Sequence, residues 1–176
     1  RALGFRCDGL LGELDDEQAL SLLALMAPDD ATDLLGRLPT ATAQNFLERL
    51  PKNRRERLIE LLRYPEDTVG GIMTNDVVTL PLDLAVKEAR LILRDRLKEP
   101  DFTYFMYVVE NDDSRILRGT ISLRDFVRAQ DEQRVEDIMN RYTSTLDPLE
   151  PASDGSYRVL NGHMAALPVV GKEGRL

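Results

Sequence analysis

Two aspartates four residues apart, Asp29 and Asp33, are the residues of this chain best placed to hold a metal ion. They follow Pro28 in a segment with helical periodicity, and residues four apart project from the same face of a helix. Two like charges there repel each other slightly unless a cation lies near them. The ordinary interpretation is that both are hydrated acids, with Asp29 offsetting the positive end of a helix dipole. The spacing alone leaves both interpretations open.

Composition excludes several classes of function. The 176 residues include 31 acidic and 23 basic side chains, a net charge of −8, whereas nucleic-acid binding depends largely on Lys and Arg contacts to phosphate. We therefore expect no nucleic-acid partner. The single histidine and the single cysteine, His163 and Cys7, are far apart in the sequence, so no Ser/His/Asp or Cys/His set is available and we expect no enzyme. No glycine-rich phosphate loop follows a strand either.

The length allows one ordinary domain or two small ones. A lone cysteine cannot form an internal disulfide, which fits a reducing compartment. No apolar run approaches the roughly 20 residues that span a bilayer, and no signal peptide is present. These features predict a soluble piece.

From Glu13 to Tyr64 the sequence has the pattern of short helices separated by prolines. The phrase Leu-Leu-Gly-Arg-Leu-Pro at 34–39 returns as Phe-Leu-Glu-Arg-Leu-Pro at 46–51, and a looser third copy ends at Pro65. Short helices are weak alone and must stack to bury their apolar faces, so we expect a small superhelical array. Its predicted core consists of Leu22, Leu23, Met26, Leu34, Leu35 and Leu38.

The stretch 64–74, Tyr-Pro-Glu-Asp-Thr-Val-Gly-Gly-Ile-Met-Thr, marks the change from helices to alternating strands and helices. Pro65 ends the preceding helix because it lacks an N–H and clashes with the earlier turn. Gly70 and Gly71 permit backbone angles closed to other residues. The stretch therefore predicts a linker, and the glycines suggest that it is also a hinge.

Residues 77–129 predict a β-α-β-β-α unit. Its expected elements are a strand at 77–79, a helix at 84–97, a strand at 104–109, a hairpin partner at 117–122 and a helix at 123–129. The order then begins again, because Val-Glu-Asp-Ile-Met at 135–139 parallels Val-Gly-Gly-Ile-Met at 69–73, and Leu-Pro-Val-Val at 167–170 parallels 107–109. The sequence stops where a final strand and helix of the second copy belong. We expect an internal repeat with an incomplete second member.

This arrangement resembles a tandem pair of CBS domains, and the whole chain resembles the cytosolic portion of the MgtE family of bacterial magnesium channels. The motifs that carry the resemblance are, in chain order, Tyr64-Pro-Glu-Asp67, Gly70-Gly-Ile-Met-Thr74, Tyr107-Val-Val109, Ser122-Leu-Arg-Asp125, Ile138-Met-Asn140, Leu167-Pro-Val-Val170 and Glu173-Gly-Arg-Leu176. The resemblance implies a multidomain α plus α/β fold, with a superhelical N domain of short helices before a tandem CBS (Bateman) module whose second copy is incomplete. The implied domains are a helical N domain truncated at its start, a linker and two CBS copies, at 1–64, 65–71, 72–134 and 135–176.

In that family, Mg²⁺ binds acids between the N and CBS domains and holds a transmembrane pore shut. The resemblance implies that this chain is the Mg²⁺-sensing regulatory region, on the cytoplasmic side of the cell membrane, with Asp29 and Asp33 as metal ligands. It also implies a homodimer through the CBS module and, in the full-length protein, a pore domain as partner. In the family, the acids that bind Mg²⁺ together with this pair lie at the end of the second CBS domain and in a plug helix. We expect both of these parts to be missing from the present sequence. His163 lies in a loop where a relative can present an acid, but a lone histidine there is expected at the surface or in packing.

CBS modules also bind adenine nucleotides, and some MgtE channels bind ATP there. The recurring element is a Ser/Thr-x-x-Asp turn, matched by Ser122 and Asp125, whose Asp hydrogen-bonds the ribose hydroxyls while Arg124 could face phosphate. Phe105 would flank the base, although a strand aromatic is usually core. The ordinary interpretation is that Ser122 caps a helix beginning at Leu123 and that Asp125 complements its dipole. Three alternatives thus remain beside the channel: a free-standing CBS sensor for ATP or another adenine nucleotide, a helical-repeat scaffold for a protein partner and, least favoured, an enzyme.

Overall fold

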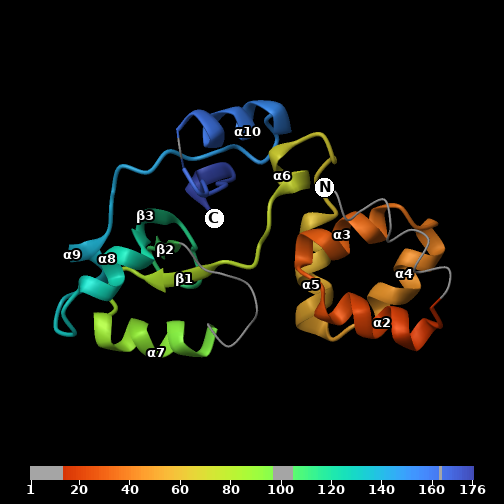
Figure 1. Ribbon diagram of the computed structural model, residues 1–176, viewed down its shortest axis with the longest axis horizontal. Coiled ribbons are helices and arrows are strands. Elements are labelled where there is room, and N and C mark those ends of the chain that lie inside the picture. The colour runs from red at the N-terminus through yellow and green to blue at the C-terminus, as the bar shows by residue number, and fades with distance from the viewer. Residues whose placement is uncertain (1–13, 97–104, 163) are drawn as a thin grey trace. The chain divides into compact units, whose positions relative to one another are not determined.

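The computed structural model describes residues 14–96, 105–162 and 164–176, which form two compact units (Figure 1). The first, here the helical unit, contains the described residues up to Glu66 together with Gly71–Asp76. The second, here the CBS unit, contains Asp67–Gly70 and the described residues from Val77 to Leu176. A helical unit followed by a mixed unit with a small sheet confirms the predicted fold class. The segment predicted as a linker is divided between the two units.

The described part of the helical unit is built from short helices, and those after the first begin at prolines. Its elements are α2 (Asp16–Leu25), α3 (Pro28–Gly36), α4 (Thr40–Arg49) and α5 (Lys52–Leu61). Pro28 is the first residue of α3, whereas Pro39 and Pro51 are the N-cap residues of α4 and α5. A proline at such a position loses nothing by lacking an N–H, and its fixed φ suits the start of a helix. The repeated Leu-Pro phrase therefore sets where successive helices begin, as predicted.

The core of the helical unit confirms most of the predicted apolar face. Its buried members are Ala19, Leu23, Ala31, Leu34, Leu35, Phe46, Leu50 and Leu58. The prediction was wrong for Leu22, which is 36% exposed, whereas Leu23 beside it is fully buried. On α2 the buried face runs through Ala19 and Leu23, and Leu22 projects about 100° away from Leu23. The end of α2, which has no basic residue in its last turn, is capped from α5 by Arg54, which donates to the carbonyl of Leu23 at 2.9 Å.

The CBS unit begins with a three-stranded sheet in the order β1-β2-β3. Its elements are β1 (Val78–Pro81), α7 (Val86–Arg96), β2 (Phe105–Val109), β3 (Leu117–Ser122) and α8 (Leu123–Arg128). Strand β1 pairs parallel to β2, and β2 pairs antiparallel to β3. The predicted β-α-β-β-α order and the hairpin between the second and third strands are confirmed. Pro81 fits because it lies at the end of an edge strand, where its missing donor breaks no inner ladder.

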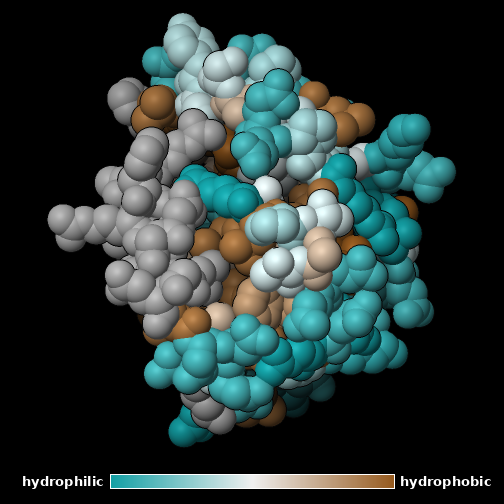
Figure 2. Space-filling view, turned by 90° about the vertical axis from the view of Figure 1, so that its right-hand side faces the viewer, coloured by the Kyte–Doolittle hydropathy of each residue, from teal (hydrophilic) through white to brown (hydrophobic). Residues whose placement is uncertain are grey.

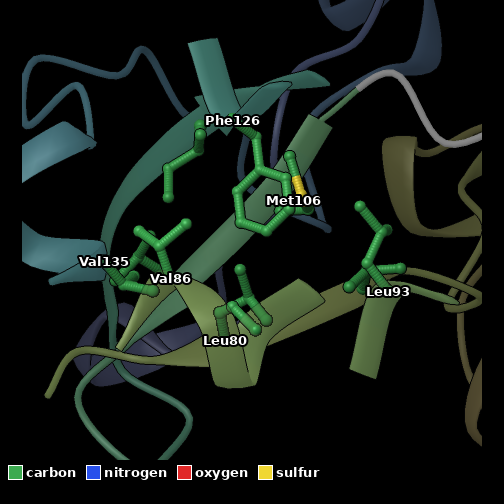
Figure 3. Packing of buried hydrophobic residues seen from close by; sticks show 10 residues of the cluster. Leu80, Val86, Leu93, Met106, Phe126 and Val135 are labelled. Carbon is green, nitrogen blue, oxygen red and sulfur yellow. The ribbon is translucent and has the colours of Figure 1, made fainter. Parts of the chain in front are cut away.

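One face of this sheet forms the core of the first CBS copy. Its buried members are Val78, Leu80, Val86, Ala89, Leu93, Met106, Val108, Ile121, Phe126 and Val135. Figure 3 shows side chains from β1, β2, α7 and α8 directed toward one another, with Phe126 beside Met106. The spacing of three and four residues predicts that Val86, Ala89, Leu93 and Leu97 share one face of the helix expected at 84–97. The first three are buried, and Leu97 lies outside the described residues.

The second copy repeats the first in reduced form. It contains α9 (Val135–Ile138), α10 (Ala152–Asn161) and the 3₁₀ turn η1 (Lys172–Gly174). Leu146 forms a parallel bridge with Val169, and Val170 donates to the carbonyl of Leu146 at 2.9 Å, as β1 pairs with β2 in the first copy. The strand predicted at 167–170 is thus present as an isolated bridge only.

The short segment that precedes each copy is bound to the other copy. Before the first copy, α6 (Val69–Ile72) follows Asp67, and its start pairs with the second copy at the beginning of α10. The N–H of Val69 donates to the carbonyl of Glu150 at 2.9 Å, and the N–H of Ala152 donates to the carbonyl of Asp67 at 2.8 Å. In Figure 1 the start of α6 accordingly lies beside α10.

The same two hydrogen bonds occur at the start of α7 in the first copy. There the N–H of Val135 donates to the carbonyl of Leu84, and the N–H of Val86 donates to the carbonyl of Gln133, both at 2.9 Å. The repeat seen in the sequence is therefore a repeat of contacts as well. The two copies exchange their leading segments, which ties them into one compact unit.

Candidate functional site

Asp29 and Asp33 both lie on α3, one turn apart. The N-cap residue of α3, Ala27, has no side chain that could cap the helix, so Asp29 in the first turn offsets the exposed N–H groups and the dipole. Asp29 is half-buried and Asp33 is exposed. The geometry therefore supports the structural interpretation of Asp29 and is compatible with the metal interpretation of the pair.

Two carboxylates are a partial ligand set. Among the described residues, no group of three or more His, Cys, Asp or Glu side chains is placed to hold a metal ion. Mg²⁺ usually keeps several of its waters and takes only one or two protein carboxylates, so a pair does not exclude it. Figure 2 shows hydrophilic residues around a smaller hydrophobic area on one side of the molecule. An exposed carboxylate such as that of Asp33 is hydrated by default. The metal role of Asp29 and Asp33 stays a prediction.

Ser122 is the N-cap residue of α8, as its ordinary interpretation predicts. Its Oγ accepts the N–H of Asp125 at 3.1 Å and donates to the Oδ2 atom of Asp125 at 2.6 Å. This reciprocal pair satisfies a donor of the first turn and holds the Asp125 carboxylate in one orientation. Arg124 and Asp125 are both exposed. Their side chains are thus accessible to a ligand at the start of α8.

The register of the sheet brings an aromatic side chain to the same place. Phe105, the first residue of β2, is directly opposite Ser122, the last residue of β3. Directly paired residues on adjacent strands project from the same face, and the Phe105 side chain is half-buried. Phe105, Ser122, Arg124 and Asp125 are therefore gathered at one end of the β2–β3 hairpin. The sequence motif identified these residues, but only the register shows that they are neighbours.

The sheet face opposite the core of the first copy carries polar residues to which the sequence assigned no role in a site. Thr120 bridges Asn140 through its main chain, and its Oγ1 lies 3.0 Å from the Oγ1 of Thr143 in the second copy. Opposite Thr120 in the register is Tyr107, which is 7% exposed and whose pKa is raised by burial. Side chains alternate between the two faces of a strand. Tyr107 lies between Met106 and Val108, which belong to the core, so its position in the sequence places it on the opposite face of β2.

Profiles of known families match both units. The MgtE intracellular N domain matches residues 6–67, and the CBS domain matches residues 69–132. The chain has the domains of the MgtE cytosolic region. The matched ranges meet at the stretch that the sequence marks as the change from helices to strands.

The sequence is also similar to curated MgtE proteins. It is 31% identical over 147 residues to the magnesium transporter MgtE of Thermus thermophilus. The aligned residues make up 84% of this chain and 32% of the transporter. It is 25% identical over 161 residues to the magnesium transporter MgtE of Bacillus subtilis. This alignment includes 92% of this chain and 35% of the Bacillus protein. The chain thus spans about a third of the length of these two relatives.

A solved structure of similar sequence has the same fold throughout. The cytosolic domain of the Mg²⁺ channel MgtE in complex with ATP superposes with a TM-score of 0.89 at 28% identity, covering 98% of this chain and 70% of that one. These relatives are magnesium transporters and the cytosolic domain of a Mg²⁺ channel.

A membrane-spanning helix and the residue His163 are not found among the described parts of the candidate site. No helix among the described residues has the length and apolar character needed to cross a bilayer. His163, the residue considered in place of a family acid, lies outside the described residues, as does Cys7. The described part of the candidate site therefore consists of the pair on α3 and the group at the start of α8.

Proposed function

We propose that this chain is the Mg²⁺-sensing regulatory region of an MgtE-type magnesium channel. The observation that carries the proposal is the likeness to the cytosolic domain of the Mg²⁺ channel MgtE, which extends over 98% of this chain and includes both units. In this proposal the region lies on the cytoplasmic side of the membrane, dimerises through its CBS module and acts on a pore domain of the full-length protein. Its role is regulatory, without catalysis.

The physical basis is a difference in Mg²⁺ affinity between two arrangements of the units. Mg²⁺ held by carboxylates lowers their mutual repulsion and stabilises whichever arrangement brings most carboxylates within reach of the ion and its waters. A ligand shifts such an equilibrium only by its differential affinity for the two states. Asp29 and Asp33 are the proposed contribution of the helical unit. Loss of Mg²⁺ would favour the open arrangement and thereby the open pore.

We expect millimolar Mg²⁺ to compact the protein and to increase its resistance to protease. The double substitution Asp29→Asn/Asp33→Asn keeps the side-chain volumes and removes both charges, so it should raise the Mg²⁺ concentration at half response by about tenfold, the equivalent of ~1.4 kcal/mol. Hydrodynamic radius measured against MgCl₂, with NaCl at matched ionic strength, checks this expectation.

The matched control removes two charges from the same unit at exposed positions elsewhere, Asp30→Asn/Glu48→Gln. Its midpoint should equal that of the unmodified protein. Equal shifts in both double variants would mean that general charge, and not the α3 pair, determines the response. No Mg²⁺ response in the unmodified protein would contradict the sensing proposal itself.

A second candidate function is adenine-nucleotide binding by the CBS unit. It is favoured by the group at the start of α8 and by the similarity to a cytosolic domain crystallised with ATP. In this proposal the Asp125 carboxylate, oriented by Ser122, accepts hydrogen bonds from ribose hydroxyls. Phe105 contacts the base, and Arg124 faces phosphate.

Calorimetric titration with ATP tests the nucleotide proposal. Asp125→Asn retains an acceptor for Ser122 but weakens the charge-assisted bonds to ribose, so ATP affinity should fall by about tenfold. Glu132→Gln, an equal charge change at an exposed site of the same unit, should leave the affinity unchanged. Equal affinities of the unmodified protein and the Asp125 variant would show that this carboxylate is not a nucleotide ligand.

A further inference from the structure

Residues 67–70 precede the first CBS copy in sequence but are built into the second. Besides the two hydrogen bonds that join Asp67 and Val69 to the start of α10, the N–H of Gly70 donates to the carbonyl of Pro148 at 2.8 Å. Val69 is 3% exposed. Opposite it, α10 carries Gly155, where an added Cβ would lie 2.4 Å from Val69 Cγ2. The segment therefore fills a site on the second copy that accommodates it closely.

Residues 71–76, which come next, belong to the helical unit. The Nδ2 atom of Asn75 donates to the carbonyl of Arg57 and to Glu60, at 3.0 Å each. The guanidinium of Arg57 pairs with Asp76 at 3.0 Å, and the Asp76 side chain is only 16% exposed. Partial burial makes such a pair more costly to break than a surface pair. This stretch is therefore anchored on α5.

We propose that residues 67–70 are a permanent tether of the helical unit to the second CBS copy. The chain leaves the helical unit after Glu66, is fixed on the second copy, returns to the helical unit at Gly71, and leaves again for the first copy at Val77. The helical unit is thus joined to both copies. Any reorientation of the helical unit takes place at the boundaries after residues 66, 70 and 76, the second of which lies within α6.

A disulfide between Thr68 and Pro151 tests whether the tether is permanent. These residues form an antiparallel bridge flanked by the hydrogen bonds from Val69 and Ala152, so they are a non-hydrogen-bonded pair, in which the side chains are closest. The Cα separation of about 4.5 Å for such pairs falls within the range of disulfides. Thr68→Cys/Pro151→Cys is made in a Cys7→Ser background. The control is Ala85→Cys/Arg134→Cys, the equivalent pair of the first copy.

The Mg²⁺-dependent change in radius is measured for both cysteine pairs, oxidised and reduced; this arm rests on the proposed function. A permanent tether predicts the same change in all four samples. A change that disappears on oxidation of the 68–151 pair alone, and returns on reduction, would overturn the proposal, because the segment would then have to leave the second copy.

Amide hydrogen exchange provides an arm that needs no Mg²⁺ response, so failure of the sensing proposal does not affect it. The tether predicts that the N–H groups of Val69 and Gly70 exchange as slowly as that of Ala152 at the start of α10. Gly155→Ala should speed exchange at both by about tenfold, whereas Ser156→Ala, an exposed neighbour on α10, should not. Rapid exchange at Val69 and Gly70 in the unmodified protein would overturn the tether.

Discussion

Replacing Phe126 by alanine is expected to destabilise the CBS unit by about 3–5 kcal/mol. Phe126 is 1% exposed and is the largest of the fully buried side chains. Its removal leaves a cavity in the core of the first copy, beside Met106 (Figure 3). The guanidinium of Arg90 lies 5.3 Å from the ring centroid, so the substitution also removes a cation–π contact.

Urea unfolding followed by circular dichroism measures this effect. Two compact units need not unfold together, so the transition of the CBS unit is fitted separately from that of the helical unit. Val127→Ala is the matched control, because it shortens the next residue of α8, which is 65% exposed, and should change stability by about 0.5 kcal/mol or less. Similar losses in the two variants would contradict the assignment of Phe126 to the core.

Element order could be predicted from the sequence because it depends on local patterns. The steps of three and four residues from Val86 to Leu93 fix the buried face of α7 within one helix, and the β-rich run ending at Val109 needs no partner to be recognised. Prolines at 28, 39 and 51 mark helix starts through their fixed φ. Leu22 was misassigned because the adjacent Leu22 and Leu23 project about 100° apart, and their spacing does not tell which of them is central to the buried face of α2.

The exchange of leading segments could not be predicted, because it is made by main-chain groups that carry no side-chain signal. The N–H of Val69 reaches the carbonyl of Glu150, 81 positions later, and nothing in either side chain specifies that pairing.

In the candidate site, too, local contacts could be predicted and contacts between distant segments could not. Spacing identified Ser122 and Asp125, whose contact is local, but the position of Phe105 opposite Ser122 depends on strand register. For Asp29 and Asp33 the sequence yields a shared helix face and no third ligand.

Replacing Gly71 by alanine is expected to cost the helical unit about 3 kcal/mol, at the upper end of overpacking effects. A Cβ built at Gly71 would lie 2.2 Å from the carbonyl oxygen of Pro65 and 2.8 Å from the Cα atom of Glu66. Both neighbours are main-chain atoms, so no side-chain rotation relieves the contact. Close approach to residues 65–66 therefore explains why this position is glycine, and its role as a hinge stays a separate prediction.

Gly36→Ala is the control for Gly71→Ala, because it makes the same chemical change in the same unit. The nearest atom to a Cβ at Gly36 is Oε1 of Glu66 at 3.5 Å, an ordinary contact, and Gly36 is the last residue of α3. Removing glycine from a helix usually gains up to about 1 kcal/mol, so this variant should be neutral or slightly more stable in thermal unfolding. If both variants unfold at the same temperature, the chain around Pro65 can move aside and the 71–76 segment is held less firmly than its contacts with Arg57 indicate. A loss confined to Gly71→Ala would show that the close approach of Gly71 to Pro65, which lie on either side of the tether at residues 67–70, is a fixed part of the helical unit.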